Sequence, residues 1–363
     1  MVAALKRQSV LQLAGLAAEA AAGVADVAGS MHDRIHAVTP LAVVPATSKI
    51  HRMIYRTVQE SFLLAAGLAR GVSEPHEWQE RVHEIGLQPA LQGVVGDYLA
   101  ETQHPAHRDM MLVNAQGEPM IPEPGGKIAI LLHGLCMDEA AFSDPGWGTL
   151  TDTFAPSGWI SLRVRYNSGL SIAENGRQLA HILAQLAPDQ LVLVGHSMGG
   201  LVMRSAYAQA GAELWLAALR LAVYMGTPHW GAPLEQLGEW ANRWLGVTPW
   251  SAPLMRLGAV RSQGIQDLRC GDVGHDQLDL PPAAHHLLVG GELSWARRWP
   301  LSDLVGDGLV SLRSALAQDI SATRLLRAPH LYRLSLPGRG HLALLSDPEV
   351  HEEIRQFWGR IAV

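Results

Sequence analysis

The chain has 363 residues, 48% of them hydrophobic and 17% charged, and its formal net charge is −6. This composition excludes an intrinsically disordered chain and is typical of a globular protein with a substantial core. A mildly acidic chain without a run of Lys or Arg also argues against nucleic acid as a partner.

The first 105 residues are predicted to be mostly helical. Apolar residues recur at spacings of three and four over about 9–37, and a second such stripe covers about 48–70. A Pro-containing break separates these two predicted helices, and a shorter helix is expected over about 76–100. We therefore assign 1–105 to a helical N-terminal region.

The first predicted helix also bears on localisation. Lys6 and Arg7 precede an Ala- and Leu-rich stretch, which resembles a secretory signal. Polar residues interrupt that stretch, however, at Gln12, Glu19, Asp26 and Asp33. No apolar run approaches the roughly 18 residues that a membrane span needs. We expect a cytoplasmic protein, with a secreted or membrane-associated one as the alternative.

The polar face of this helix carries acids rather than Lys or Arg, which favours packing on the rest of the protein over binding to a membrane surface. A homo-oligomer contact and a peripheral membrane contact through the N-terminal helices are the alternatives.

Residues 106–363 show a different pattern, in which short apolar runs alternate with helical stretches. This alternation predicts an α/β domain with a mostly parallel sheet and helices on both faces. Strands are expected over 127–132, 159–166, 190–194, 219–225, 286–289 and 330–336, and helices over 172–186, 199–210 and 348–361.

The alternation stops over about 231–282, which is a candidate cap or lid insertion. Trp240 and Trp244 lie within it and Trp230 just before it. These side chains are expected either to line an apolar acyl channel or to form the core of the cap. Both alternatives favour a hydrophobic substrate.

Gly195-His196-Ser197-Met198-Gly199 fits the G-x-S-x-G pattern between a predicted strand and a predicted helix. In that context a sharp turn exposes the Ser hydroxyl at the carboxyl edge of the sheet, and the glycines leave room for close approach. Ser197 is therefore the predicted nucleophile, and His196 is expected to pack beneath it.

A serine nucleophile needs a base. His341 follows the last predicted strand in the sequence Gly338-Arg339-Gly340-His341-Leu342, where the base is expected for such a chain order. His285 and His286 precede a strand and are interpreted as structural.

The base needs an acid that holds its tautomer and stabilises its cation. Asp307, in Gly306-Asp307-Gly308, lies between the last two predicted strands and gives the chain order Ser, Asp, His. Asp303, four residues earlier, is the main competitor.

A tetrahedral oxyanion needs two preorganised N–H donors. Met198, the residue after the nucleophile, is expected to supply one. The other is expected from the loop after the first strand, His133-Gly134-Leu135-Cys136-Met137, with Leu135 as the preferred donor and Cys136 as the second choice. His133 is expected to brace this loop.

The two cysteines, Cys136 and Cys270, are too few for a disulfide framework or a typical zinc site. We expect reduced thiols, with a single bridge as the alternative. Cys136 is a weak rival nucleophile, because it lacks the strand–turn–helix context of Ser197.

Together these motifs resemble bacterial lipases and esterases of the α/β-hydrolase superfamily. The segment Met225-Gly226-Thr227-Pro228-His229 with Gly231 is similar to the GTPH-x-G segment of the PGAP-like branch. The stretches 163–175 and 261–271 also look like a bacterial esterase subgroup with a helical N-terminal extension.

The resemblance implies carboxylic-ester hydrolysis by Ser197, Asp307 and His341, an oxyanion hole from Leu135 and Met198, and no cofactor or metal. It leaves the substrate open between small-molecule and lipid esters. Expected substrate contacts are His133, Gly134, Thr227, Trp230, Trp240 and Trp244. An acyltransferase with the same triad is the main alternative, and a non-catalytic binding protein or another chemistry on this scaffold is a more remote one.

Overall fold

The computed structural model describes residues 88–101, 103, 107–142, 150, 153–154, 158–211, 214–232, 262–275, 279–293, 306–318 and 325–361. The chain divides into two compact units, Met1–Ala90 with Gly238–Val260, and Leu91–Leu237 with Arg261–Val363. Nearly all described residues belong to the second unit. The helices predicted over 9–37 and 48–70, the boundary at residue 105 and the cap over 231–282 stay predictions.

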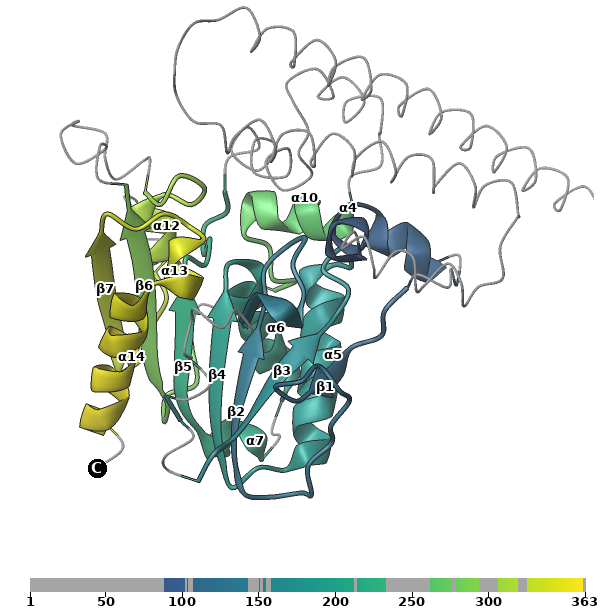
Figure 1. Ribbon diagram of the computed structural model, residues 1–363, viewed down its shortest axis with the longest axis horizontal. Coiled ribbons are helices and arrows are strands. Elements are labelled where there is room, and N and C mark those ends of the chain that lie inside the picture. Colours follow the sequence, from purple (N-terminus) through teal and green to yellow (C-terminus); the bar gives the residue numbers. More distant parts are fainter. Residues whose placement is uncertain are drawn as a thin grey trace, which may run out of the picture. The chain divides into compact units, whose positions relative to one another are not determined.

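The described residues form a seven-stranded sheet in the order β1-β3-β2-β4-β5-β6-β7 (Figure 1). Strand β1 pairs antiparallel with β3, and every other neighbouring pair is parallel. The strands are β1 (Met111–Val113), β2 (Lys127–Leu132), β3 (Ile160–Arg165), β4 (Gln190–His196), β5 (Leu219–Met225), β6 (His285–Glu292) and β7 (Leu331–Pro337).

The central strands are apolar because both of their faces are covered. In β2 every residue from Ile128 to Leu132 is buried, which is the pattern of a parallel strand between two helical layers. Six of the seven strands confirm the sequence prediction to within a few residues. The exception, β1, was not predicted, because three residues at a sheet edge carry too short a pattern to recognise.

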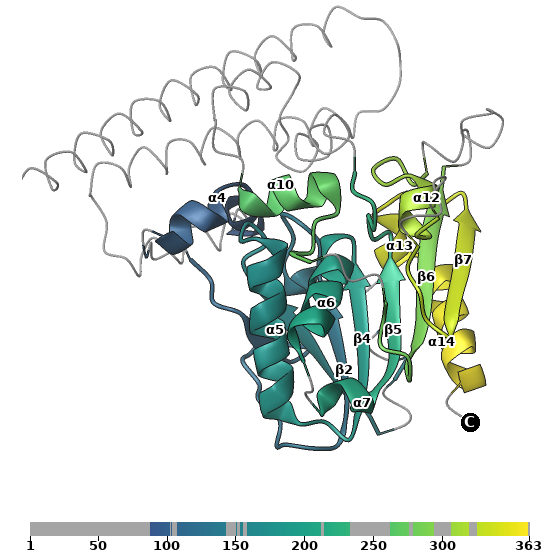
Figure 2. The ribbon, with the colours of Figure 1, turned by 180° about the vertical axis from the view of Figure 1, so that it is seen from behind.

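Helices lie on both faces of the sheet. Figure 2 shows α5 (Ile172–Leu186), α6 (Met198–Gln209) and α7 (Trp215–Ala218) on one face, while α14 (Pro348–Ile361) lies on the other. The remaining helices are α4 (Gln88–Glu101), η1 (Glu139–Phe142), α10 (Gln263–Cys270), α12 (Leu312–Ala315) and α13 (Ala343–Ser346). Among the described residues, no helix combines the length and apolar character that crossing a bilayer requires.

The core beneath α14 shows how the sequence pattern produces the layer. Its apolar residues recur at helical spacing and face the sheet, with Ile354, Phe357 and Trp358 all buried. The Trp358 ring meets Trp159 edge-on, with ring centroids 5.3 Å apart. Aromatic contacts of this kind add to the free energy gained by burying the rings.

The strand order, the single antiparallel edge strand and the helices on both faces are those of the α/β-hydrolase fold, as the sequence predicted. In open parallel sheets of this kind, ligands bind at the carboxyl ends of the strands. The loops that follow β2, β4, β5, β6 and β7 all begin at that edge, which is where a site is expected.

Candidate active site

Ser197 lies in a strained turn between β4 and α6. Its φ of 52° and ψ of −121° fall in a region that L residues rarely adopt. The turn is fixed by the Ser197 amide, which donates to the carbonyl of Met225 at 2.8 Å. The side chain therefore projects from the carboxyl end of β4, although the residue as a whole is only 2% exposed.

The glycines of the motif are sterically required. A Cβ on Gly195 would lie 2.5 Å from the amide nitrogen of Gly200, and one on Gly199 would lie 2.5 Å from the carbonyl oxygen of Leu132. Both obstructing atoms are backbone, so no side-chain rotation could relieve the clash. The two glycines of the G-x-S-x-G motif are thus needed for the start of α6 to pack closely against the ends of β2 and β4.

Asp307 and His341 are in direct contact. The His341 Nδ1 atom lies 2.8 Å from Asp307 Oδ2, and both side chains are buried. The other carboxylate oxygen of Asp307 accepts the amides of Leu309 and Val310 at 3.0 and 2.8 Å. The His341 amide donates to the Asp307 carbonyl at 3.0 Å. The competitor Asp303 lies outside the described residues.

This pair faces the end of β5, where Ser197 is also anchored. A Cβ on Gly226 would lie 3.1 Å from both Asp307 Oδ2 and His341 Cε1. Gly226 follows Met225, whose carbonyl holds the Ser197 amide. The second ring nitrogen of His341, Nε2, is buried and has no hydrogen-bond partner within the described structure. The arrangement therefore leaves Nε2 free to accept a proton from a hydroxyl.

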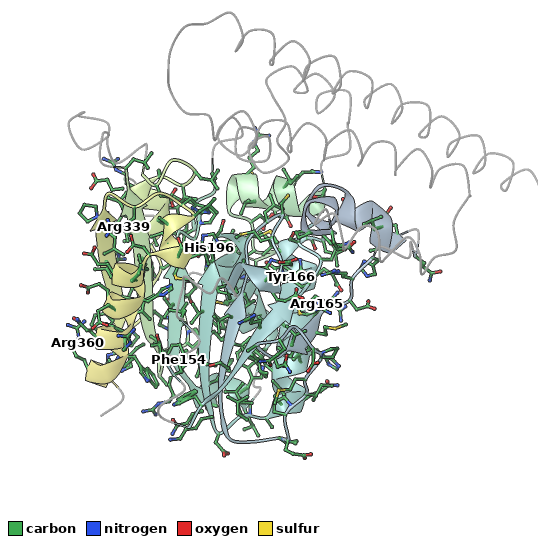
Figure 3. All side chains as sticks on the ribbon, viewed as in Figure 1. Phe154, Arg165, Tyr166, His196, Arg339 and Arg360 are labelled. Carbon is green, nitrogen blue, oxygen red and sulfur yellow. The ribbon has the colours of Figure 1, made fainter. Side chains whose placement is uncertain are left out.

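His196 links the turn at Ser197 to His341. Its Nε2–H donates to the His341 carbonyl at 3.1 Å, and the two ring centroids are 4.7 Å apart. Burial, followed by the neighbouring His341, lowers the pKa of His196 well below its usual value, so the ring is neutral. Figure 3 shows His196 at the carboxyl edge of the sheet, and the expectation that it packs beneath Ser197 stays a prediction.

Residues 133–137, which we call the HGL loop, lie beside Ser197. A Cβ on Gly134 would be only 3.1 Å from Ser197 Cβ. The loop closes a tight turn in which the Met137 amide donates to the Gly134 carbonyl at 3.4 Å. The Cys136 amide is already bound, because it donates to Ser168 Oγ at 3.1 Å. Among the described residues the Leu135 amide has no hydrogen-bond acceptor, so it is the more available of the two candidate donors.

Met198 is the first residue of α6, so its amide has no helix carbonyl four residues earlier to bind. The amides at helix starts also carry partial positive charge. The Met198 amide therefore lies at the start of α6, directly after Ser197, and its role as an oxyanion donor stays a prediction.

His133 supports the loop from within. It is fully buried and stacks on Tyr166 with ring centroids 4.2 Å apart, while the Tyr166 hydroxyl donates to the His133 carbonyl at 2.6 Å. Its Nδ1–H donates to the Gly134 carbonyl at 2.9 Å. Burial lowers the pKa of His133, so the ring is a neutral brace.

The GTPH segment after β5 packs inward. Thr227 is fully buried, and a Cβ on Gly200 would lie 2.1 Å from Thr227 Oγ1. Trp230 is partly exposed, and its amide donates to Ser314 Oγ at 3.0 Å. Trp240 and Trp244 lie outside the described residues. The expected substrate contacts of these four residues stay predictions.

Both cysteines are free. Burial raises the pKa of Cys136 to about 12, so its thiol is a poor nucleophile at neutral pH. Across the described ranges, no group of three or more His, Cys, Asp or Glu side chains is arranged to hold a metal ion.

Two supporting residues were missed by sequence reasoning. Tyr166 and Ser168 come directly after β3 and bind the HGL loop. This part of the chain is distant in sequence from the loop. The pattern Tyr166-Asn167-Ser168-Gly169 reads as an ordinary strand-ending turn, and nothing local connects it with residues 133–137.

No protein-family profile matches the chain, and no curated protein matches it. Among solved structures, the mature lipase BlEst2 of Bacillus licheniformis is 16% identical with a TM-score of 0.46, covering 69% of this chain and 97% of that one. A thermophilic esterase from Thermogutta terrifontis is 16% identical with a TM-score of 0.40, covering 70% and 94%. The carboxylesterase CesB of Bacillus subtilis is 13% identical with a TM-score of 0.39, covering 65% and 84%. The fold assignment rests on the sheet itself.

Proposed function

We propose that this chain is a serine hydrolase of carboxylic esters that acts through an acyl-enzyme on Ser197. The observation that carries the proposal is the buried Asp307–His341 pair, whose unpaired Nε2 lies at the edge where Ser197 occupies a strained turn. A serine hydroxyl becomes a useful nucleophile only when a positioned base can take its proton.

In the first half of the reaction, His341 Nε2 takes the Ser197 proton while Oγ attacks the ester carbonyl. Asp307 receives the Nδ1–H bond, which keeps Nε2 as the accepting nitrogen and stabilises the imidazolium that forms. The imidazolium then returns its proton to the leaving alcohol, and the acyl group stays on Ser197.

The negative charge of the tetrahedral intermediate is assigned to the amides of Leu135 and Met198. The Cys136 amide, the other candidate in this loop, already donates to Ser168, which favours Leu135 as the donor. Donors fixed before the reaction need no reorganisation when the charge develops, and each such donor contributes about 10²–10³ in kcat.

The second half consumes one water. His341 takes a proton from the water as it attacks the acyl carbonyl, and the same two amides hold the second oxyanion. Collapse of this intermediate expels Ser197 Oγ, which recovers its proton from His341, and releases the carboxylic acid.

For the substrate we propose an ester with a hydrophobic acyl group, either a small molecule or a lipid. Support comes from the Trp-rich sequence after β5, with Trp230, Trp240 and Trp244 as proposed contacts. Membership of the PGAP-like branch is a part of this proposal that rests on the GTPH-x-G resemblance alone.

The direct test is hydrolysis of p-nitrophenyl esters from acetate to palmitate by the wild type and by Ser197→Ala side by side. We expect turnover by the wild type with an optimum at a longer acyl chain, and none by the variant. An inert wild type on every chain length would contradict ester hydrolysis. Adding an alcohol acceptor and analysing the products separates hydrolysis from acyl transfer, because only transfer gives the new ester.

A further inference from the structure

Helix α4 lies directly against the HGL loop. A Cβ on Gly93 would lie 2.2 Å from Cys136 Sγ and 2.8 Å from the Cys136 amide nitrogen. The thiol could turn aside, but the amide nitrogen is backbone and could not. The backbones of the helix and the loop are therefore in contact, and a glycine at position 93 is what allows the contact.

A second glycine, one turn along the same helix face, reaches the loop indirectly. Asn167 Nδ2 donates to the Gly96 carbonyl at 2.8 Å, and a Cβ on Gly96 would lie 1.9 Å from Asn167 Oδ1. The next residue, Ser168, accepts the Cys136 amide. Helix α4 thus meets Cys136 both directly and through the Asn167-Ser168 pair.

Helix α10 fastens α4 in this position. The Ser262 hydroxyl donates to the Gly93 carbonyl at 2.6 Å, and the Gln263 amide donates to Asp97 Oδ2 at 2.9 Å. Both donors lie at the start of α10, which is beside α4 in both ribbon views (Figures 1 and 2). Helix α10 therefore binds α4 at the carbonyl of Gly93, the residue that contacts the HGL loop.

The loop needs this support because Cys136 has a φ of 54°. A side chain other than glycine occupies that left-handed region only where its surroundings hold it there. Leu135, the proposed oxyanion donor, precedes Cys136 in the same tight turn. A shift of Cys136 would therefore rotate or displace the neighbouring amide.

We infer that α4 is a positioning element of the proposed oxyanion hole, and that Gly93, acting through Cys136, sets the orientation of the Leu135 amide. The inference rests on the proposed function for its effect on rate. It adds that α4, which lies outside the α/β alternation, influences the catalytic step through the HGL loop. A displacement of α4 would therefore lower kcat by moving the oxyanion donor.

The test substitutes Gly93→Ala and measures three quantities. We expect kcat to fall by about 10²-fold with KM changed by less than about threefold, because a displaced donor is lost chiefly in the transition state. Affinity for an aliphatic trifluoromethyl ketone, which forms a tetrahedral adduct on serine, should fall in parallel. Amide hydrogen exchange of the peptide that contains residues 134–137 should become faster.

The matched control is Gly96→Ala, which adds the same methyl group on the same helix face. Its obstacle is the Asn167 side chain rather than the backbone of the HGL loop, and Gly96 reaches Cys136 only through Asn167 and Ser168, so we expect a smaller kcat loss of about tenfold or less. Equal losses in the two variants that follow their melting temperatures would mean that α4 acts through stability alone, which overturns the inference.

A second variant covers the case in which Gly93→Ala does not fold. Ser262→Ala removes the bond to the Gly93 carbonyl and should raise exchange in the HGL loop and lower kcat several-fold. Wild-type exchange and wild-type kcat in the folded variant would overturn the inference. If the wild type itself hydrolyses no ester, the proposed function fails, and the exchange measurement alone decides whether α4 sets the loop.

Discussion

The Asp307–His341 pair and the HGL loop lie at the same edge of the sheet, but different parts of the chain hold them. Asp307 is fixed by amides two and three residues away, and the His341 amide donates to the carbonyl of Asp307 itself. Arg339, two residues before His341, is paired with Asp347 at the start of α14. The acid and base are thus positioned by their own two loops, by each other, and by the His196 ring, which donates to the His341 carbonyl.

The HGL loop depends instead on residues far away in sequence. The Cys136 amide donates to Ser168 Oγ, and the His133 carbonyl accepts a hydrogen bond from the Tyr166 hydroxyl. The backbone of the loop is also in contact with Gly93. Substitutions in these two parts of the site should therefore affect different steps of the reaction. Substitutions within the pair should abolish proton transfer, whereas substitutions that are remote in sequence should weaken the stabilisation of the oxyanion.

The largest effect is expected from Asp307→Asn. The amide oxygen can still accept the Leu309 and Val310 amides, so the loop should keep its shape. The amide nitrogen, however, would face His341 Nδ1 as a donor and favour the wrong imidazole tautomer. We expect kcat to fall by about 10⁴-fold, measured by steady-state ester hydrolysis.

Asp189→Asn is the control for that variant. Asp189 accepts the Gly126 amide at 2.9 Å at the exposed start of β4, remote from the pair. Its kcat should stay near that of the wild type. A similar loss in both variants, or an active Asp307→Asn enzyme, would remove Asp307 from the proposed role.

Ser168→Ala should have an intermediate effect on the other half of the site. It leaves the buried Cys136 amide without an acceptor, which should cost about 1–3 kcal/mol of unfolding free energy. We expect kcat to fall by about tenfold at nearly constant KM, since the HGL loop loses its main tether. Urea unfolding and steady-state kinetics measure the two effects.

Ser314→Ala provides the comparison, because Ser314 is also buried and also accepts an amide, that of Trp230. It should lose similar stability with a much smaller loss of kcat. Equal kcat losses in the two serine variants would show that the rate follows stability rather than the HGL loop.

The smallest effect on the rate is expected at His286, which acts on the stability of the fold rather than on the Asp307–His341 pair. His286 on β6 donates to the Pro281 carbonyl, and burial lowers its pKa to about 4. Between about pH 6.5 and pH 4, His286 is protonated in the unfolded chain but stays neutral in the folded chain. The free energy of unfolding therefore falls as the pH falls through this range. The loss is on the order of 3 kcal/mol at 1.36 kcal/mol per pKa unit.

Urea unfolding at neutral and mildly acidic pH measures this loss. His286→Gln should flatten part of the pH dependence, whereas His181→Gln, on the exposed side of α5, should leave it unchanged. An identical slope in the wild type and His286→Gln would contradict the assignment of the shift to His286.

The sequence predicted those parts of the molecule whose pattern is local. The buried strands, the amphipathic α5 and α14, and the G-x-S-x-G turn all satisfy constraints between near neighbours in the chain. Asp307 and His341 could be proposed because the chain order of this fold places the acid and the base after the last strands.

What the sequence did not predict depends on contacts between distant segments. Nothing at Ser168 or Gly93 indicates that each meets Cys136, because that meeting requires α4 and the end of β3 to converge on the HGL loop. Gly93 within a helix looks like a weak helix former, and only the packing explains it.

The central claim is that Ser197 carries the acyl group. The most direct measurement is to treat the protein with a fluorophosphonate, determine the intact mass, and map the modified peptide, with Ser197→Ala alongside. The account predicts one adduct per chain, located on Ser197, loss of esterase activity in proportion to labelling, and no adduct on the variant. An enzyme that hydrolyses esters while its adduct forms elsewhere, or that stays active in Ser197→Ala, would contradict it.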